Sequence, residues 1–205
     1  MEQLPGLPAA AFEKQDPTPD AEFYDFPRFV THIDAGAIAA VTSVYRDVFP
    51  AGGSLLDLMS SWVSHLPADV AYASVVGHGM NEEELSANPR FSRWFLQDFN
   101  ADPILPLDDT SFDGVGLCVS VQYLQRPVEL FLEVARVLRP GAPFVVSFSN
   151  RCFPTKAVAI WQSMRGPEQQ RLVAAYMRAA GFVETSTRTF APPGGDPLWV
   201  VIARA

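Results

Sequence analysis

Apolar residues recur at helical spacing in several stretches of the chain. After Asp34, a suitable N-cap, they are three or four positions apart until Pro50 and a glycine pair end the run. These positions are Ile38, Val41, Val44, Tyr45 and Val48. A second stripe begins at Pro127, where proline suits the first helical position, and stops before Pro140. Each stripe predicts an amphipathic helix. Further helices are expected over 60–66, 81–85, 154–164 and 167–180.

Short, continuous apolar runs lie between these helices and predict buried strands. The first run, 54–58, follows the glycine pair, and the second, 69–76, ends at Gly77-His78-Gly79. Similar runs follow later in the chain, and the last two are separated by a Pro-Pro-Gly-Gly turn. These later runs cover 114–119, 144–148, 182–189 and 198–203.

The alternation of strands and helices predicts the fold class. It indicates a parallel sheet covered by helices on both faces, and two terminal strands joined by a turn indicate an antiparallel pair. We therefore predict an α/β fold with a doubly wound sheet. Ligands of such sheets bind beyond the carboxyl ends of the strands. Chemistry is expected in the loops that follow Leu58, Val76, Leu96 and Val119.

Composition narrows the class of protein. The 205 residues, 48% of them hydrophobic, suit one domain over 21–205, preceded by a flexible, proline-containing arm over 1–20. The formal net charge is -8 and no run of Lys and Arg is present, which argues against nucleic acid as a partner. The two cysteines and three histidines lack the spacing of metal ligands. Without a leader or a long apolar run, we expect a cytoplasmic protein that makes no contact with membranes.

Three segments in the middle of the chain resemble a known family. Gln97-Asp98 is followed by LPLDDTSFD at 105–113 and by EVARVLRPG at 133–141, in order and at the spacing seen in class I S-adenosylmethionine-dependent methyltransferases of the type 11 group. The resemblance covers about 52–203 in element order. It implies a Rossmann-like methyltransferase fold: a seven-stranded, mostly parallel sheet with an antiparallel C-terminal strand pair. It also implies S-adenosylmethionine as the cofactor and methyl transfer to O, N or S of a small polar acceptor.

The loop after the first strand departs from the family pattern. Asp57 is kept, but Met59, Ser61 and Val63 stand where glycines are usual, and each added side chain restricts the approach of a ligand to the backbone. The hydroxyl groups of Ser60 and Ser61, with amides that open a helix, remain candidates for binding the cofactor carboxylate.

Two further cofactor positions follow from the resemblance. Gly79 stands where an acidic residue usually holds the ribose, so Asn81 or Glu82 would have to substitute for it. Asp98 matches the residue that receives the adenine amino group. The expected cofactor-binding residues are Asp57, Met59, Ser60, Ser61, Gly79, Met80, Asn81, Asp98, Phe99 and Val119.

The acceptor site is expected between two polar segments. Residues 24–32, named here the lid segment, either cover the acceptor or staple the arm onto the sheet. Residues 147–156 follow the fifth strand; there Asn150 and Arg151 either orient an acceptor carboxylate or serve as a helix cap and a surface ion pair. The expected catalytic residues are His32, which is able to take a proton near pH 7, and Tyr123. The expected substrate-binding residues are Tyr24, Arg28, Gln122, Asn150 and Arg151.

Two functions remain open at this point. Methyl transfer needs chiefly the correct placement of two reactants, so the lack of a catalytic triad is no objection to an enzyme. The alternative is a binding or regulatory protein that has lost the cofactor together with its glycines. His65 and His78 are interpreted as structural, and Trp62 as a candidate to face the sulfonium. Titration with S-adenosylmethionine would separate the two functions.

Overall fold

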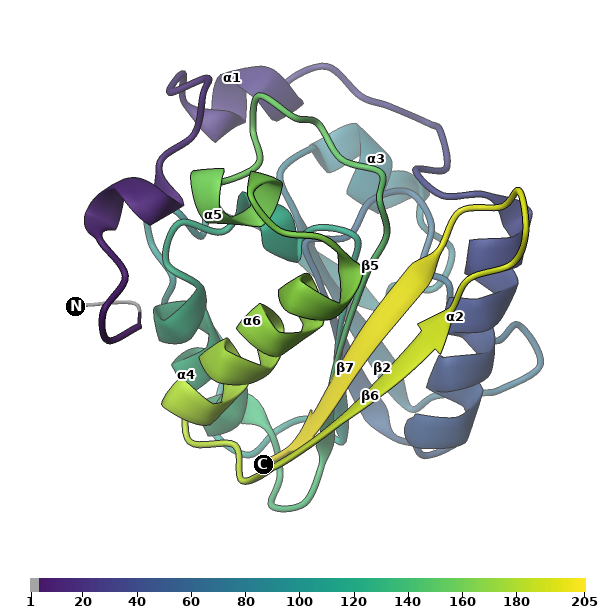
Figure 1. Ribbon diagram of the computed structural model, residues 1–205. Coiled ribbons are helices and arrows are strands. Elements are labelled where there is room, and N and C mark those ends of the chain that lie inside the picture. The colour runs from purple at the N-terminus through teal and green to yellow at the C-terminus, as the bar shows by residue number, and fades with distance from the viewer. Residues whose placement is uncertain (1–3) are drawn as a thin grey trace.

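Seven strands form a single sheet in the computed structural model, which describes residues 4–205 (Figure 1). Their order is β3-β2-β1-β4-β5-β7-β6, and β7 runs antiparallel to both of its neighbours while the other pairs are parallel. The predicted fold class is confirmed. The bounds are β1 Ser54–Leu58, β2 Ser74–Gly79, β3 Arg93–Leu96, β4 Gly114–Cys118, β5 Pro143–Phe148, β6 Glu184–Phe190 and β7 Leu198–Arg204.

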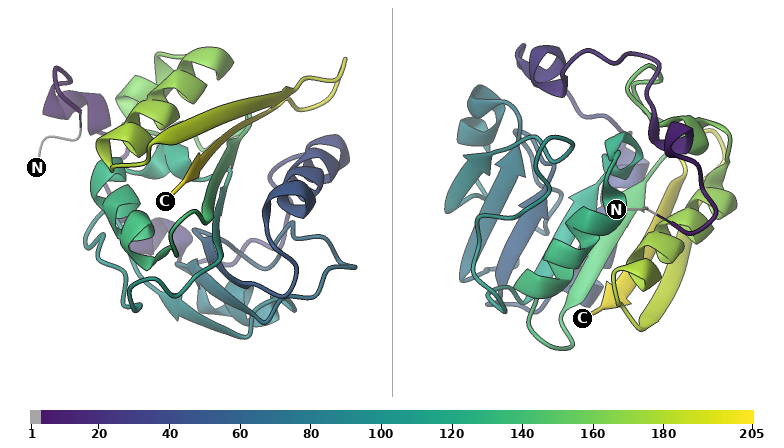
Figure 2. Two further views of the ribbon diagram at one scale, coloured as in Figure 1. Left: turned by 90° about the horizontal axis from the view of Figure 1, so that it is seen from below. Right: turned by 90° about the vertical axis from the view of Figure 1, so that its left-hand side faces the viewer.

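Helices cover both faces of this sheet (Figure 2). On one face α2, Ala35–Val48, packs Val41 and Val44 into the core, and on the other face lie α4, Pro127–Val137, and α6, Gly166–Ala179. The side chain of Asp34 accepts a hydrogen bond from Ala37 N at 2.8 Å, so the predicted N-cap of α2 is confirmed. The remaining helical elements are η1 Ala9–Phe12, α1 Asp20–Tyr24, α3 Glu82–Ala87, η2 Val121–Tyr123 and α5 Ala159–Gln162.

Three expected elements differ from the structure. Residues 60–66 form no helix, residues 69–73 are not part of β2, and 154–158 precede a short α5 instead of belonging to it. In the first segment Ser60 and Ser64 donate their hydroxyls to Asp57, which competes with regular helical bonding. In the last segment the amides of Val158 and Ala159 are bound by carbonyls of Gln122 and Glu13, which are distant in sequence.

The N-terminal segment packs against the domain. Phe12 is buried against Tyr176 of α6, and Lys14 forms an isolated β-bridge with Val158. A flexible arm was expected over 1–20, but residues 9–20 make specific backbone and side-chain contacts. Residues 1–3 lie outside the described part.

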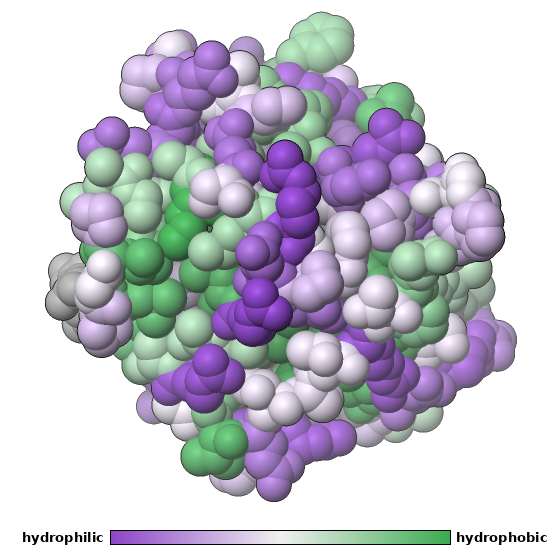
Figure 3. All heavy atoms as spheres, viewed as in Figure 1, coloured by the Kyte–Doolittle hydropathy of each residue, from purple (hydrophilic) through white to green (hydrophobic). Residues whose placement is uncertain are grey.

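On the face seen in Figure 3, polar and apolar side chains are mixed, with an apolar area at its left-hand side. No helix in the described range is long and apolar enough to cross a bilayer.

Candidate functional site

A cavity of about 250 Å³ lies at the carboxyl ends of β1, β2 and β4, where the doubly wound topology predicts a ligand site. The loops after these strands, the turn after β3, the lid segment and the start of the loop after β5 all contribute to its wall. Among the described residues no group of three His, Cys, Asp or Glu side chains is arranged to hold a metal ion.

All but two of the residues predicted for the site line this cavity. The two exceptions are Gln122 and Asn150. Gln122 is buried beneath the wall, where its amide donates to Val119 O at 2.8 Å, and Asn150 is exposed and bonded to the Ser149 hydroxyl. Neither side chain lines the cavity, so no contact in this conformation supports the prediction that they bind the substrate. The lining residues from the predicted set are Tyr24, Arg28, His32, Asp57, Met59, Ser60, Ser61, Gly79, Met80, Asn81, Asp98, Phe99, Val119, Tyr123 and Arg151.

The β1 loop, residues 59–64, is held by His78 of β2. Met59 N donates to His78 Nδ1 at 3.0 Å, Ser60 N donates to the His78 carbonyl at 2.7 Å, and His78 Nε2 donates to Gln97 O at 2.9 Å. This pattern assigns the neutral imidazole with its proton on Nε2. Burial lowers the pKa of His78 to about 3, and its ring stacks on Phe99 at 3.8 Å. His78 therefore ties the loop to the turn after β3, in agreement with a structural role.

Met59 keeps the backbone conformation of a glycine. Its φ of 51° lies in the left-handed region, and Val119 after β4 has a φ of 47°. Such angles are strained for residues with a Cβ, most of all for a β-branched one, and strain of this kind concentrates at functional sites. Both residues face the cavity. Met59 therefore adopts a left-handed turn at a position where the resemblance implies a glycine.

The serines of the β1 loop point back into the protein. Ser60 donates to Asp57 at 2.8 Å, and Ser61 donates to Glu84 of α3 at 2.5 Å. No helix follows, so the expected helix-opening amides are absent, and those of Met59 and Ser60 are bound to His78. In this conformation these hydroxyls and amides are bound within the protein, and their binding of the cofactor carboxylate stays a prediction. Burial raises the pKa of Asp57 to about 6, although the hydrogen bonds that it accepts from the Ser60 and Ser64 hydroxyls lower this pKa.

The end of β2 offers no carboxylate to a ribose. A Cβ at Gly79 would lie 2.7 Å from the Ser60 carbonyl oxygen, so any larger residue would displace the β1 loop. Asn81 caps α3 by accepting from Glu84 N, and its amide donates to Tyr24 O and Asp25 O. Glu82 is exposed. The side chain of Asn81 is thus engaged in holding the lid segment, and Glu82 faces solvent outside the cavity lining.

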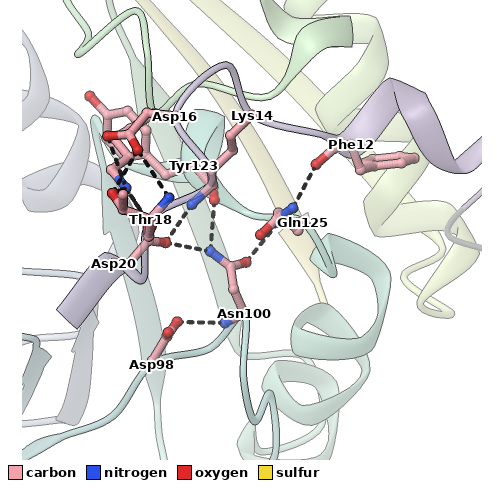
Figure 4. Close-up of polar contacts among 10 residues, drawn as sticks. Phe12, Lys14, Asp16, Thr18, Asp20, Asp98, Asn100, Tyr123 and Gln125 are labelled. Carbon is pink, nitrogen blue, oxygen red and sulfur yellow. Dashed lines mark hydrogen bonds and ion pairs between the residues drawn. The ribbon is translucent and has the colours of Figure 1, made fainter. Parts of the chain in front are cut away.

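Asp98 begins a turn that connects the site to the N-terminal segment (Figure 4). Its carboxylate accepts from Asn100 N at 2.9 Å, and the Asn100 side chain donates to Asp20 and to Tyr123 O and accepts from Gln125 N. Asp20 also pairs with Lys14 and, at 3.5 Å, with Lys156, all three being nearly inaccessible to solvent. Asn100 thereby fixes the Asp98 turn against both the arm and the η2 segment.

Aromatic rings around Phe153 form the other end of the cavity. The rings of His32 and Tyr123 lie 5.6 and 6.0 Å from the Phe153 ring, and the Arg28 guanidinium carbon lies 5.7 Å from it. The Tyr123 hydroxyl accepts from Phe153 N at 2.8 Å, and burial raises its pKa to about 12. Partial desolvation at the cavity mouth lowers the pKa of His32, so its imidazole is neutral at pH 7.

Two other expected contacts are not made. The Trp62 indole donates to Val30 O at 3.0 Å and lies outside the cavity lining, so it holds the lid segment. The side chain of Arg151 is 64% exposed and pairs with Asp196 at 2.8 Å, which is the surface ion pair that the sequence left as an alternative.

Comparison with known proteins matches the middle of the chain to a family. Residues 59–146 match the family described as Methyltransferase domain. This stretch, less than half of the chain, resembles a methyltransferase domain, and the fold is shared with solved methyltransferase structures. The predicted family is confirmed, and the match begins at Met59, the left-handed residue of the β1 loop.

The relatives of this methyltransferase domain differ in how much they share with it. A curated protein of Teredinibacter turnerae, the biotin biosynthesis bifunctional protein BioHC, is 41% identical over 54 residues, which are 26% of this chain and 9% of that protein. A methyltransferase from Thermotoga maritima, described as a possible histamine N-methyltransferase, has a TM-score of 0.61 and 17% identity over 82% of this chain and 89% of that one. Phosphoethanolamine N-methyltransferase 2 from Haemonchus contortus, in complex with S-adenosyl-L-methionine, has a TM-score of 0.60 and 12% identity over 82% of this chain and 51% of that one. The two solved structures share the fold.

Sequence reasoning missed three residues that organise the site of the methyltransferase domain. Glu84 accepts from Ser61 and from Arg28 N, and Asn100 forms the hub described above. Phe153 is the ring around which His32, Tyr123 and Arg28 lie. Only Asn100 had a local signal, because an asparagine two residues after an aspartate is typical of a turn. In the sequence, Glu84 was one of three acidic residues in an expected helix, and Phe153 was part of a loop.

Proposed function

We propose that this protein binds S-adenosylmethionine in the cavity and transfers a methyl group to O, N or S of a small polar acceptor. One observation supports this most strongly: Asp98 and the left-handed Met59 turn, which follow different strands, line the same cavity as His32 and Tyr123. The methyltransferase domain supplies the chemical context, and the net charge of -8 favours a small acceptor over a nucleic acid.

The Asp98 end of the cavity supports the proposal. In the described structure the hydrogen bond from Asn100 N is the only one that the Asp98 carboxylate accepts, which leaves an oxygen for an amino group. Phe99 is fixed by stacking on His78, and both line the cavity. We infer that Asp98 and Phe99 hold the adenine, and that Met59 and Val119 contact the remainder of the cofactor through their backbones.

The acceptor is held at the Phe153 end in this proposal. S-adenosylmethionine supplies an electrophilic methyl group on a sulfonium, so the protein has chiefly to orient the attacking atom and exclude water. The neutral imidazole of His32 takes a proton that the acceptor loses, and the Tyr123 hydroxyl, which stays protonated because of its raised pKa, donates a hydrogen bond. Both groups lie beside Phe153.

The second candidate, a binding protein without methyl transfer, is favoured by the β1 loop alone, whose first two amides are already bound to His78. Incubation with methyl-labelled S-adenosylmethionine and a metabolite extract, followed by mass spectrometry, separates the two. The proposal expects a labelled product and S-adenosylhomocysteine, with both reduced in Asp98→Ala. Cofactor binding with no label transferred to any metabolite would favour the second candidate.

A further inference from the structure

Hydrogen bonds to the backbone of the lid segment, before and after Arg28, hold this residue at the cavity. Its own amide donates to Glu84 Oε1 at 2.7 Å. The Asn81 amide holds Tyr24 O and Asp25 O at 3.0 Å each, and the Trp62 indole holds Val30 O at 3.0 Å. Both elements that supply these donors, the α3 start and the β1 loop, lie at the carboxyl ends of strands. The position of Arg28 is therefore set before any ligand binds.

The guanidinium of Arg28 is surrounded by rings. Its carbon lies 4.6 Å from the centre of the Phe23 ring and 5.7 Å from that of Phe153. Two of its five N–H groups are used, since one nitrogen donates to Phe26 O at 3.1 Å and another to Phe23 O at 2.8 Å. The side chain lines the cavity, so the remaining donors are available to a ligand there.

Arg28 has no carboxylate partner in the described structure: within residues 4–205, no Asp or Glu oxygen lies within 4.0 Å of its guanidinium nitrogens. Arg151, the other arginine of the lining, is neutralised by Asp196. The carboxylates that share the cavity with Arg28 accept hydrogen bonds from donors other than its guanidinium. These carboxylates are Asp20, Asp57, Glu84 and Asp98. A half-buried cation without a counterion is costly and is stabilised by an anionic ligand.

We propose that Arg28 binds a carboxylate of the methyl acceptor, which makes the acceptor a carboxylic acid. This rests on the proposed function and specifies its substrate class. A planar carboxylate accepts two hydrogen bonds from a guanidinium, and charge-assisted bonds of this kind are about twice as strong as neutral ones. A phosphate would bring a second negative charge to a place with one unpaired cation. A carboxylate at Arg28 sets the body of the acceptor against Phe153, next to His32 and Tyr123.

Matched small molecules test the proposal without requiring turnover. We would measure the binding of 3-phenylpropionate, its amide and benzyl phosphate by calorimetry, in the presence of S-adenosylhomocysteine. The carboxylate is expected to bind at least about tenfold more tightly than the amide, which corresponds to about 1.4 kcal/mol. Arg28→Gln should abolish this preference, Arg28→Lys should keep part of it, and Arg188→Gln, on the distant strand β6, should keep all of it.

Three results would overturn the assignment: equal affinities for carboxylate and amide, tighter binding of the phosphate, or an unchanged preference in Arg28→Gln. A fourth concerns the cofactor. If Arg28→Gln weakened S-adenosylhomocysteine while the preference for carboxylate persisted, Arg28 would serve the cofactor's own carboxylate instead. Failure of S-adenosylhomocysteine to bind any variant would contradict the proposed function alone, because the preference of the wild type for carboxylate over amide is measurable without it. Arg28→Lys retains the charge and covers the case in which Arg28→Gln does not fold.

Discussion

Acidification should destabilise the β1 loop through His78. Burial lowers the pKa of this imidazole from 6.5 to about 3, so the folded protein keeps it neutral at pH 5 while the unfolded chain protonates it. The contribution of the neutral His78 imidazole to the free energy of unfolding is fully present above pH 6.5, and it is lost as the pH falls towards 3. Between pH 7 and pH 5 the linkage relation gives a loss of about 2 kcal/mol.

Replacement by glutamine isolates this contribution. The His78→Gln side chain still has an acceptor for Met59 N and a donor for Gln97 O, but it does not titrate. Urea unfolding of both proteins at pH 7 and pH 5 provides the measurement. Wild type should lose about 2 kcal/mol more than the variant between the two pH values. Because all other titrating groups are shared, an identical pH dependence of the two proteins would refute the assignment of a neutral, buried His78.

Asp57 should have the opposite effect on stability, because burial raises its pKa to about 6 and the folded protein therefore takes up a proton between pH 7 and pH 5. In the same urea assay, the free energy of unfolding of the wild type should rise by about 1 kcal/mol relative to Asp57→Asn over this pH range. Asp20→Asn leaves Lys14 and Lys156 buried without their shared carboxylate, so it should lower the free energy of unfolding by about 3–5 kcal/mol and the Tm by about 6–20 °C. Asp47→Asn removes an exposed ion pair and should cost less than about 1 kcal/mol. Equal losses in the two variants would contradict the buried network. Asp98→Ala should weaken S-adenosylhomocysteine about tenfold in calorimetry, while the exposed Asp108→Ala should not, and matching affinities would remove Asp98 from the adenine site.

Local patterns were sufficient for most of the fold. The run at 54–58 was predicted with its observed bounds because it is continuous, apolar and preceded by glycines, and Asp34 was identified as the N-cap from its position before an amphipathic stripe. The blocks at 105–113 and 133–141 were readable from their order and spacing in the sequence, and the salt bridge of Arg136 with Asp109 joins them in space. Elements formed by neighbours in sequence were thus predictable.

The errors arise where a residue's partner is distant in sequence. The helix expected over 154–164 is interrupted because the amides of Val158 and Ala159 bind the carbonyls of Gln122 and Glu13. In the same segment the buried Lys156 donates to the Thr18 carbonyl, 138 positions away. Arg151 was assigned to the substrate because the pairing with Asp196, across 45 positions, leaves no local signal. For the same reason the sequence predicted only that Arg28 belongs to the lid segment. Its position in the cavity depends on Glu84 and Asn81, which are distant in sequence.

The central claim is that a β1 loop with Met59 in place of glycine still forms one side of a cofactor site. Calorimetric titration of the wild-type protein with S-adenosylmethionine and S-adenosylhomocysteine tests it most directly. Both compounds should bind, one molecule per chain, and they should compete with each other. A protein that is folded by its unfolding transition, yet shows neither heat of binding nor a change in Tm with either compound, would contradict it.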